Sequence, residues 1–157
     1  MRIVVFSDSH NDYYALKNIV LTHKSTNCFL HLGDGERDVD DLRNAFPNKA
    51  IYHVRGNCDW ASQSPENGIL ECGDKRILYT HGHLHAVKFG LEALKLYALK
   101  IGADIALYGH THQAYTEYDN GLYVMNPGSV TSPRGGAPSY GILDITGAGV
   151  VLNVVKL

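Results

Sequence analysis

The stretch Arg2-Ile3-Val4-Val5-Phe6-Ser7-Asp8-Ser9-His10, residues 2–10, joins a short apolar run to two polar side chains. The run from Arg2 to Ser7 is rich in β-branched residues and has the length of a buried strand. Asp8 and His10 follow where that strand would end. The apolar part is too short for the core of a signal peptide. We therefore predict a buried first strand with ligand-like side chains at its carboxyl end.

The same pattern recurs along the chain. Strand and helix patterns alternate over the first two thirds, whereas the last third contains only strand patterns. Three helices are predicted: one capped by Asn11 or Asp12, one stopped by Pro47, and one from Phe89 to Ile101. The other predicted strands are Cys28–Leu32, Ala50–Val54, Gly68–Cys72, Arg76–Thr80, Ile105–Tyr108, Ala114–Tyr118, Leu122–Asn126, Tyr140–Ile145 and Val150–Lys156. This order predicts an α/β fold with a mixed sheet or two sheets.

The composition is that of one globular domain. Of the 157 residues, 45% are apolar and 19% are charged, which excludes a disordered chain and a collagen-like repeat. No apolar run approaches the roughly 18 residues of a membrane-spanning helix. A net charge of −2 without a basic stripe argues against a nucleic-acid partner. Cys28, Cys58 and Cys72 are odd in number and lack C-x-x-C spacing, so we expect a cytoplasmic, reducing setting.

Histidine is the unusual residue of this sequence, because five of the nine lie between His81 and His112. These and several other polar residues come directly after predicted strands. Besides Asp8 and His10, the residues in such positions are Asp34, Asn57, His81, His83, His85, His110 and His112. Ligands of α/β sheets bind at the carboxyl ends of the strands. Five separate segments are therefore predicted to converge on one place.

The residue types at these positions favour a metal centre. If the segments are extended, Asp8 with His10, and His110 with His112, point to the same side. Carboxylate, imidazole and amide groups without a thiolate suit manganese, iron, nickel, cobalt or zinc better than calcium or copper(I). With one histidine taken from the group His81, His83 and His85, seven candidate ligands remain, which exceed the needs of one ion, so we expect two ions that share Asp34. Two metals about 3.5–4 Å apart are suited to phosphoryl transfer.

These residues carry a resemblance to a known family. The quoted segments are Asp8-Ser9-His10, Gly33-Asp34, Gly56-Asn57-Cys58-Asp59, His81-Gly82-His83, Gly109-His110-Thr111-His112 and Asn126-Pro127-Gly128-Ser129. Their order resembles that of the calcineurin-like metallophosphoesterases, and the last segment resembles the small prokaryotic phosphodiesterase branch. The resemblance implies a four-layer αββα sandwich of two mixed sheets flanked by helices, with residues 1–157 forming a single metallophosphoesterase domain.

The resemblance also implies roles for the ligands. Asp8, His10 and His112 would hold one ion. Asn57, His81 and His110 would hold the other. Asp34 would bridge the two ions and hold the metal-bridging hydroxide that acts as the nucleophile.

Position 58 departs from many members of this superfamily. They carry a histidine directly after the motif asparagine, whereas Cys58 stands here. A neutral thiol is a poor acid toward a leaving alkoxide, so His83 or a metal-bound water is the alternative proton donor. We expect Cys58, His83, Ser129 and Arg134 to contact substrate, each with a structural role as the alternative. Asp59 is expected to orient the Asn57 loop.

The remaining histidines and cysteines have structural interpretations. His23, His31 and His53 lie in predicted helix or strand segments, and His85 lies where a helix would begin. Cys28 and Cys72 are expected to be core thiols.

The sequence thus predicts a metal-dependent phosphoesterase, most simply a phosphodiesterase, acting on a small phosphodiester. Its cofactors would be two divalent transition metal ions, with manganese first and nickel, iron, cobalt or zinc as alternatives. The family suggests a homodimer, and no membrane partner is expected. The alternative is a catalytically weak interaction scaffold, because the small scaffold subunit of the retromer coat resembles this fold.

Overall fold

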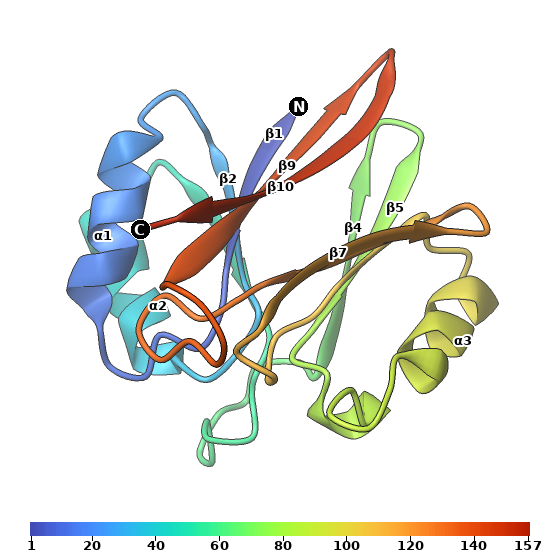
Figure 1. The fold of residues 1–157 in the computed structure, drawn as a ribbon. Coiled ribbons are helices and arrows are strands. Elements are labelled where there is room, and N and C mark those ends of the chain that lie inside the picture. Colours follow the sequence, from blue (N-terminus) through green and yellow to red (C-terminus); the bar gives the residue numbers. More distant parts are fainter.

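The computed structural model describes all of residues 1–157 and contains ten strands, three α-helices and one short 3-10 turn (Figure 1). The elements in chain order are β1 (Arg2–Phe6), α1 (Tyr13–Thr22), β2 (Cys28–His31), α2 (Glu36–Ala45), β3 (Ala50–His53), β4 (Asn67–Cys72), β5 (Lys75–Thr80), η1 (His83–His85), α3 (Glu92–Lys100), β6 (Ile105–Leu107), β7 (Ala114–Asp119), β8 (Leu122–Pro127), β9 (Ser139–Thr146) and β10 (Gly149–Lys156). No helix is long and apolar enough to cross a membrane.

The strands form two five-stranded sheets of mixed direction. The first has the order β10-β9-β1-β2-β3 and the second the order β4-β5-β6-β8-β7. At the centre of the first sheet, β1 pairs parallel with β2 and antiparallel with β9, so that Val4 lies opposite both Phe29 and Ile142. Helices α1 and α2 lie outside the first sheet, and α3 lies outside the second (Figure 1). The predicted four-layer αββα sandwich is confirmed.

The apolar run of β1 is explained by burial on both of its faces. Ile3 and Val5 belong to the apolar layer between the two sheets, whereas Val4 and Phe6 pack in the layer that contains α1 and α2. All four side chains are fully buried. A strand covered on both faces reads as a continuous apolar run, because alternate residues point to opposite sides. A third apolar layer lies between the second sheet and α3.

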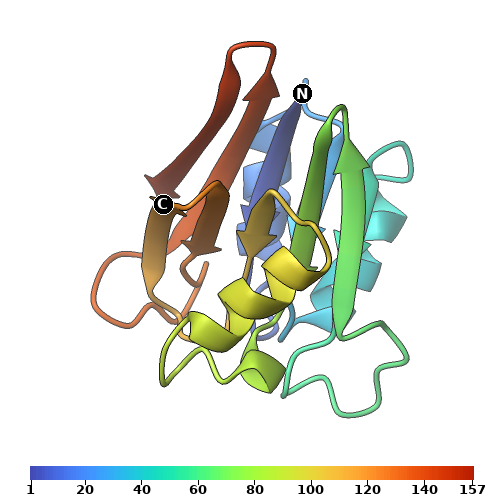
Figure 2. The ribbon, with the colours of Figure 1, turned by 90° about the vertical axis from the view of Figure 1, so that its right-hand side faces the viewer.

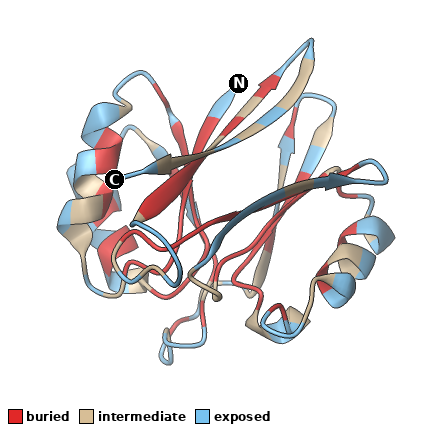
Figure 3. Ribbon diagram, viewed as in Figure 1, coloured by how far each residue is buried: buried red, intermediate tan, exposed pale blue.

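The edges of the sandwich are more open than its centre. In Figure 3, the central strands are red and the outer surfaces of the helices are pale blue. The long strands β7 and β10 are largely exposed or half-buried. The opening segment of the chain thus lies at the most protected position of the first sheet.

The structure decides between the two predicted caps of α1 and corrects the predicted third helix. The carboxylate of Asp12 accepts the N–H of Ala15 at 2.9 Å and therefore caps α1. Helix α3 begins at Glu92 and not at Phe89, which lies in the preceding loop and is 95% exposed. Gly90 disfavours helix just before that start. The buried residues of α3 are Leu94 and Ala98.

The topology brings the loops of both sheets to one edge. Strands β1, β2 and β3 run parallel, as do β5 and β6 of the second sheet. The loops that follow these strands lie along the lower edge of the molecule in Figure 2. The predicted convergence of polar side chains therefore has a structural basis.

Candidate metal centre

Five of the expected ligands lie in left-handed backbone conformations. The φ angles of Asp8, His10, Asp34, His110 and His112 are 54°, 45°, 60°, 65° and 57°. Positive φ is uncommon for residues other than glycine and concentrates at functional sites. The prediction that residues i and i+2 point to the same side assumed extended segments, and this assumption is wrong. Sharp turns, and not extended backbone, aim these side chains.

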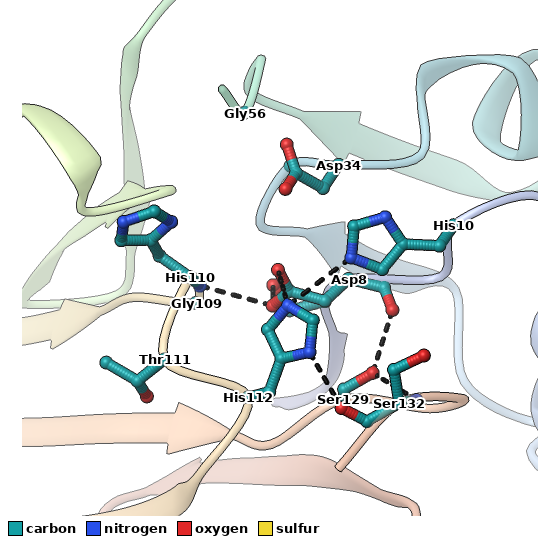
Figure 4. Close-up of polar contacts among 12 residues, drawn as sticks. Asp8, His10, Asp34, Gly56, Gly109, His110, Thr111, His112, Ser129 and Ser132 are labelled. Carbon is teal, nitrogen blue, oxygen red and sulfur yellow. Dashed lines mark hydrogen bonds and ion pairs between the residues drawn. The ribbon is translucent and has the colours of Figure 1, made fainter. Parts of the chain in front are cut away.

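The first cluster of side chains joins the loop after β1 to the loop after β6. Nε2 of His112 lies 3.1 Å from Oδ1 of Asp8 and 3.3 Å from Nε2 of His10. Figure 4 shows the three side chains pointing toward one another. The potential ligand atoms of this trio all lie within 4.8 Å of one another. Residues separated by more than a hundred positions in the chain thus form one possible metal site.

The second cluster is centred on His81. Its Nε2 lies 3.1 Å from Oδ1 of Asn57, 3.2 Å from Nδ1 of His110 and 3.4 Å from Oδ2 of Asp34. His110 and His112 therefore diverge into different clusters, and they do not point to the same side as an extended segment would require. His81 itself is fully buried.

Backbone carbonyls orient the rings of His81 and His112. Nδ1–H of His81 donates to the carbonyl O of Leu32 at 2.7 Å, and Nδ1–H of His112 donates to that of Ser132 at 2.7 Å. In the neutral ring this leaves the lone pair on Nε2. Each lone pair then faces other electron-rich ligand atoms. Histidines that bind metals are oriented in this way through their second ring nitrogen.

Asp8 provides the clearest sign that a cation fits this site. Its side chain is fully buried. Oδ2 accepts hydrogen bonds from the Ser7 hydroxyl at 2.5 Å and from the His110 N–H at 3.2 Å. Oδ1 is buried without a hydrogen-bond donor. A buried carboxylate oxygen without a partner is costly, and a metal ion would satisfy it.

Asp34 lies between the two clusters. One set of ligand atoms within 4.8 Å of one another contains Asp34, Asp8 and His81, and another contains Asp34, His10 and Cys58. Oδ1 of Asp34 also accepts the N–H of Cys58 at 2.7 Å. Gly56 permits this approach, because a Cβ at that position would overlap Oδ1 of Asp34. Asp34 therefore belongs to sets of possible ligand atoms that include residues of both clusters.

The protonation tendencies follow from burial and from opposite charges. Burial opposes ionisation of Asp34, but its contact with His81 and the N–H of Cys58 hold its pKa below the ordinary value. The contact with Asp8 raises the pKa of His112. Burial, together with the charges of His81 and Lys88, lowers the pKa of His110 to about 4. Asp34 is therefore ionised and His110 neutral at neutral pH, as metal ligands need to be, whereas the contact with Asp8 favours a proton on His112 that a bound metal would displace.

Cys58 is closer to the ligands than the sequence suggested. Its sulfur belongs to a set of possible ligand atoms with His10 and Asp34, although thiols were not included in the predicted ligand set. Burial, together with the neighbouring carboxylate of Asp34, raises the pKa of the thiol to about 11. Its position directly after Asn57 was the only sequence signal that could have suggested this placement.

Asp59 supports the turns that carry Asp34 and Asn57. Its carboxylate accepts four backbone N–H groups, at 2.8 Å from Asp34, 3.0 Å from Gly35, 3.1 Å from Glu36 and 2.8 Å from Gly56. Helix α2 begins here and has no cap from its own N-cap residue. The Asp59 carboxylate therefore also caps α2 from another segment.

The other expected site residues occupy different environments. His83 has its ring centre 5.4 Å from that of His81, and its Nδ1 is buried without a hydrogen-bond partner. Ser129 is fully buried, and its hydroxyl donates to the carbonyl O of Asp8 at 2.8 Å (Figure 4), so it positions that loop and offers no open hydroxyl to a substrate. Arg134 is exposed, and its backbone N–H donates to the carbonyl O of His112 at 2.9 Å.

The histidines outside the clusters have ordinary structural partners. His31 is fully buried, accepts the Gly33 N–H and contacts the Ser9 hydroxyl, which donates to Asp38 at 2.6 Å. His23 contacts the Tyr140 hydroxyl at 2.9 Å. His85 lies in η1 and contacts Oδ1 of Asn67 at 2.9 Å.

Two separate cavities reach this centre. One, of about 400 Å³, is lined by His112 together with Arg134 and Lys156. The other, of about 270 Å³, is lined by His10, Asp34 and Cys58 together with the exposed Trp60. A molecule held at the ligand clusters would have room on both of these sides.

The two-sheet sandwich carries carboxylate, imidazole and amide side chains on the loops at one edge. This combination is that of a phosphoesterase fold with a candidate metal centre. Residues 1–148 match the calcineurin-like phosphoesterase superfamily domain, and the chain belongs to this family. It is 36% identical over 148 residues to the probable metallophosphoesterase YsnB of Bacillus subtilis, covering 92% of this chain and 85% of YsnB. It is 35% identical over 163 residues to the phosphodiesterase YfcE of Escherichia coli, covering 98% and 81% of the two chains.

Comparison of structures gives the same family. A crystal structure from Streptococcus pneumoniae, described as a predicted phosphoesterase, superposes with a TM-score of 0.87 at 28% identity over 99% of this chain and 88% of that one. Another relative is named as a sorting protein and not as a phosphoesterase. The vacuolar protein sorting-associated protein 29 of Schizosaccharomyces pombe is 34% identical over 113 residues, covering 66% of this chain and 60% of its own.

Proposed function

We propose that this protein is a metal-dependent phosphodiesterase that hydrolyses a small phosphodiester. The observation that carries the proposal is the buried Oδ1 of Asp8, which receives no hydrogen bond and faces Nε2 of His112. The Nδ1–H of His112 donates to Ser132, so Oδ1 of Asp8 is satisfied only by a cation at Nε2, either a proton or a metal ion. Membership in the calcineurin-like phosphoesterase family and the similarity to YfcE support hydrolysis of phosphate esters.

The ligand assignment follows the two clusters. Asp8, His10 and His112 would hold one divalent ion. Asn57, His81 and His110 would hold a second ion, and Asp34 would contact both. When bound, such a pair of ions supplies a nucleophilic hydroxide at neutral pH and positive charge for the phosphoryl oxygens.

The residues of this chain set the charge and the access of the site. Asp8 and Asp34 only partly offset two dications, so the centre would attract a singly charged phosphodiester. We assign proton donation near the leaving group to His83, whose ring centre lies 5.4 Å from that of His81. The set of oxygen and nitrogen donors favours manganese, with nickel, iron, cobalt and zinc also suited.

The test uses metal-depleted protein and bis(p-nitrophenyl) phosphate. We expect hydrolysis to appear when Mn²⁺ or Ni²⁺ is added and to fall at least about a hundredfold in Asp34→Asn. Asp41→Asn is the matched control, because Asp41 is exposed on α2 and forms no ion pair. Equal metal-dependent rates in the wild type and Asp34→Asn would overturn the bridging role.

An interaction scaffold on the same fold is the second candidate function, favoured by the similarity to the sorting protein of S. pombe. Metal content tests the first candidate. The phosphodiesterase should retain, or acquire on soaking, about two transition metal ions per chain. Elemental analysis that finds none in either case would favour the scaffold.

We also propose that residues 1–157 function as one domain in the cytoplasm. The layer between the sheets draws on residues from Ile3 to Ile145, so most of the chain contributes to one core. All three cysteines are free thiols, which a reducing compartment maintains. A homodimer remains the expected oligomeric state, and sedimentation measurements would test it.

A further inference from the structure

We propose that the cavity beside His112 binds a phosphate group on one ester arm of the substrate, so that this enzyme prefers phosphodiesters with a second, terminal phosphate. The inference rests on the proposed function, because it takes the reacting phosphorus to be held at the ligand clusters. It adds the chemical class of the substrate to that function.

The cavity adjoins the reaction centre through a ligand side chain. His112 lines it and also contacts Asp8 and His10. The loop that forms much of its wall is tied to the same residue, because Arg134 N–H donates to the carbonyl O of His112. The cavity volume of about 400 Å³ lies within the range of small-molecule sites, roughly 300–1,000 Å³. A substituent extending from the reacting phosphorus can therefore enter it.

The charge of the cavity is positive. Arg134 and Lys156 line it, and no aspartate or glutamate does. Neither cation takes part in an ion pair, whereas Arg2, Arg55, Arg76 and Lys95 are paired with carboxylates. This is notable in a chain with a net charge of −2. Unpaired cations around a cavity favour an anionic ligand.

The second cavity provides the contrast. Asp34, Glu36 and Asp59 are among its lining residues, together with Arg37 and Trp60. Apart from the proposed metal ligand Asp34, a terminal phosphate would meet the carboxylates of Glu36 and Asp59 there, which disfavours it. The two arms of an asymmetric diester are thus distinguished by charge, and the phosphate-bearing arm is directed toward Arg134 and Lys156.

The loop backbone adds donors that suit an anion. Gly135, Gly136 and Ala137 line the cavity, and their three consecutive N–H groups donate to no atom of the chain. Open space surrounds both glycines, where a Cβ would meet nothing within 4 Å. Successive unpaired N–H groups in a turn are a common element of phosphate sites. The residues that carry these free donors and the two cationic side chains therefore line the same cavity.

Two chromogenic diesters that differ by one phosphate test the inference. Thymidine 5′-(p-nitrophenyl phosphate) and its 3′-phosphorylated form have the same reacting phosphorus and leaving group. In each, water adds to phosphorus, the P–O bond to p-nitrophenolate breaks, and the nucleotide arm keeps the phosphate. With Mn²⁺ present, we expect kcat/KM to be about tenfold higher for the 3′-phosphorylated diester. We expect this ratio to fall toward one in Arg134→Gln combined with Lys156→Gln.

The controls separate this inference from the proposed function. Lys100→Gln changes an exposed lysine of α3 and should keep the ratio of the wild type. Equal kcat/KM for the two diesters in the wild type would overturn the inference and leave the phosphodiesterase intact. Calorimetric binding of thymidine 3′,5′-bisphosphate against thymidine 5′-monophosphate gives a second measurement that needs no catalysis. Tighter binding of the bisphosphate without hydrolysis of either diester would support the cavity assignment and overturn the proposed function, whereas equal affinities would overturn the cavity assignment.

Discussion

Oδ2 of Asp59 accepts the backbone N–H of Asp34 at 2.8 Å. The same carboxylate also accepts the N–H groups of Gly35, Glu36 and Gly56. One side chain thus fixes the turn after β2 against the turn after β3. The proposed shared ligand depends for its position on a residue that itself contacts no other member of the two clusters.

The replacement Asp59→Asn should weaken metal binding. An asparagine side chain offers one acceptor oxygen, so at least one of the two turns loses its support. We expect Mn²⁺ affinity to fall about tenfold, in line with the loss of residues that orient metal ligands. Calorimetric titration of metal-depleted protein measures this change. Asp41→Asn is the control, and an affinity unchanged in Asp59→Asn while its thermal stability falls would show that Asp59 is only structural.

Metal binding should quench the fluorescence of Trp60. This residue is the only tryptophan of the chain and lines the cavity that reaches His10 and Asp34. Paramagnetic Mn²⁺ or Ni²⁺ bound at those ligands would lie close enough to quench it. We expect a saturable decrease in fluorescence intensity in the wild type and only the weak, linear collisional decrease in Asp34→Asn. The same saturable decrease in both proteins would place the metal elsewhere.

Asp8→Asn should separate stability from metal binding. The asparagine oxygen can accept the hydrogen bonds from Ser7 and His110, and its NH₂ group can donate to Nε2 of His112. The metal-free variant should therefore melt at or above the temperature of the metal-free wild type. Mn²⁺ at about a hundred times its Kd should stabilise the wild type by about 2.7 kcal/mol and the variant hardly at all. Thermal melts with and without Mn²⁺ measure both effects, and equal stabilisation of the two proteins would contradict the assignment of Asp8.

Stability should fall as the pH is lowered below the ordinary pKa of histidine, partly because of His31. Burial, together with the charge of His53, lowers the pKa of His31 to about 3 from its ordinary 6.5. The unfolded chain therefore takes up a proton first, and stability is lost as pH falls from 6.5 toward 3, by up to about 1.4 kcal/mol per pH unit. Denaturant unfolding at pH 7, 6 and 5 measures this slope. His31→Gln removes the titrating ring, so an identical slope in that variant would exclude His31 as the cause.

Local patterns were sufficient for most of the fold. The apolar run of β1 predicts burial on both faces, and Ile3 to Phe6 are indeed buried in two different layers. The two predicted strands Gly68–Cys72 and Arg76–Thr80 also agree with β4 and β5 to within one residue. The start of α3 was not, because the pattern from residue 89 continued through Gly90. Helical periodicity predicts which face of a helix is buried, but it does not predict the residue at which the helix begins.

The candidate metal centre was likewise predictable from the sequence only in part. The residue types and their order after the strands predicted which side chains would meet, because the carboxyl ends of parallel strands share an edge. The turns themselves were not predictable, since positive φ at Asp8, His10 and His112 depends on contacts from distant segments. Ser129 illustrates this dependence, because its hydroxyl is held by the carbonyl O of Asp8, 121 residues away.

The sequence by itself determined the α/β class, the strand order along the chain and the seven candidate ligands, because each of these follows from local residue patterns and motif spacing. Only the tertiary structure decided that left-handed turns aim the ligand side chains, that Asp59 supports Asp34, and that a basic cavity adjoins His112. These features join residues from different loops and strands. Their geometry depends on how the two sheets pack against each other, which no single stretch of sequence specifies.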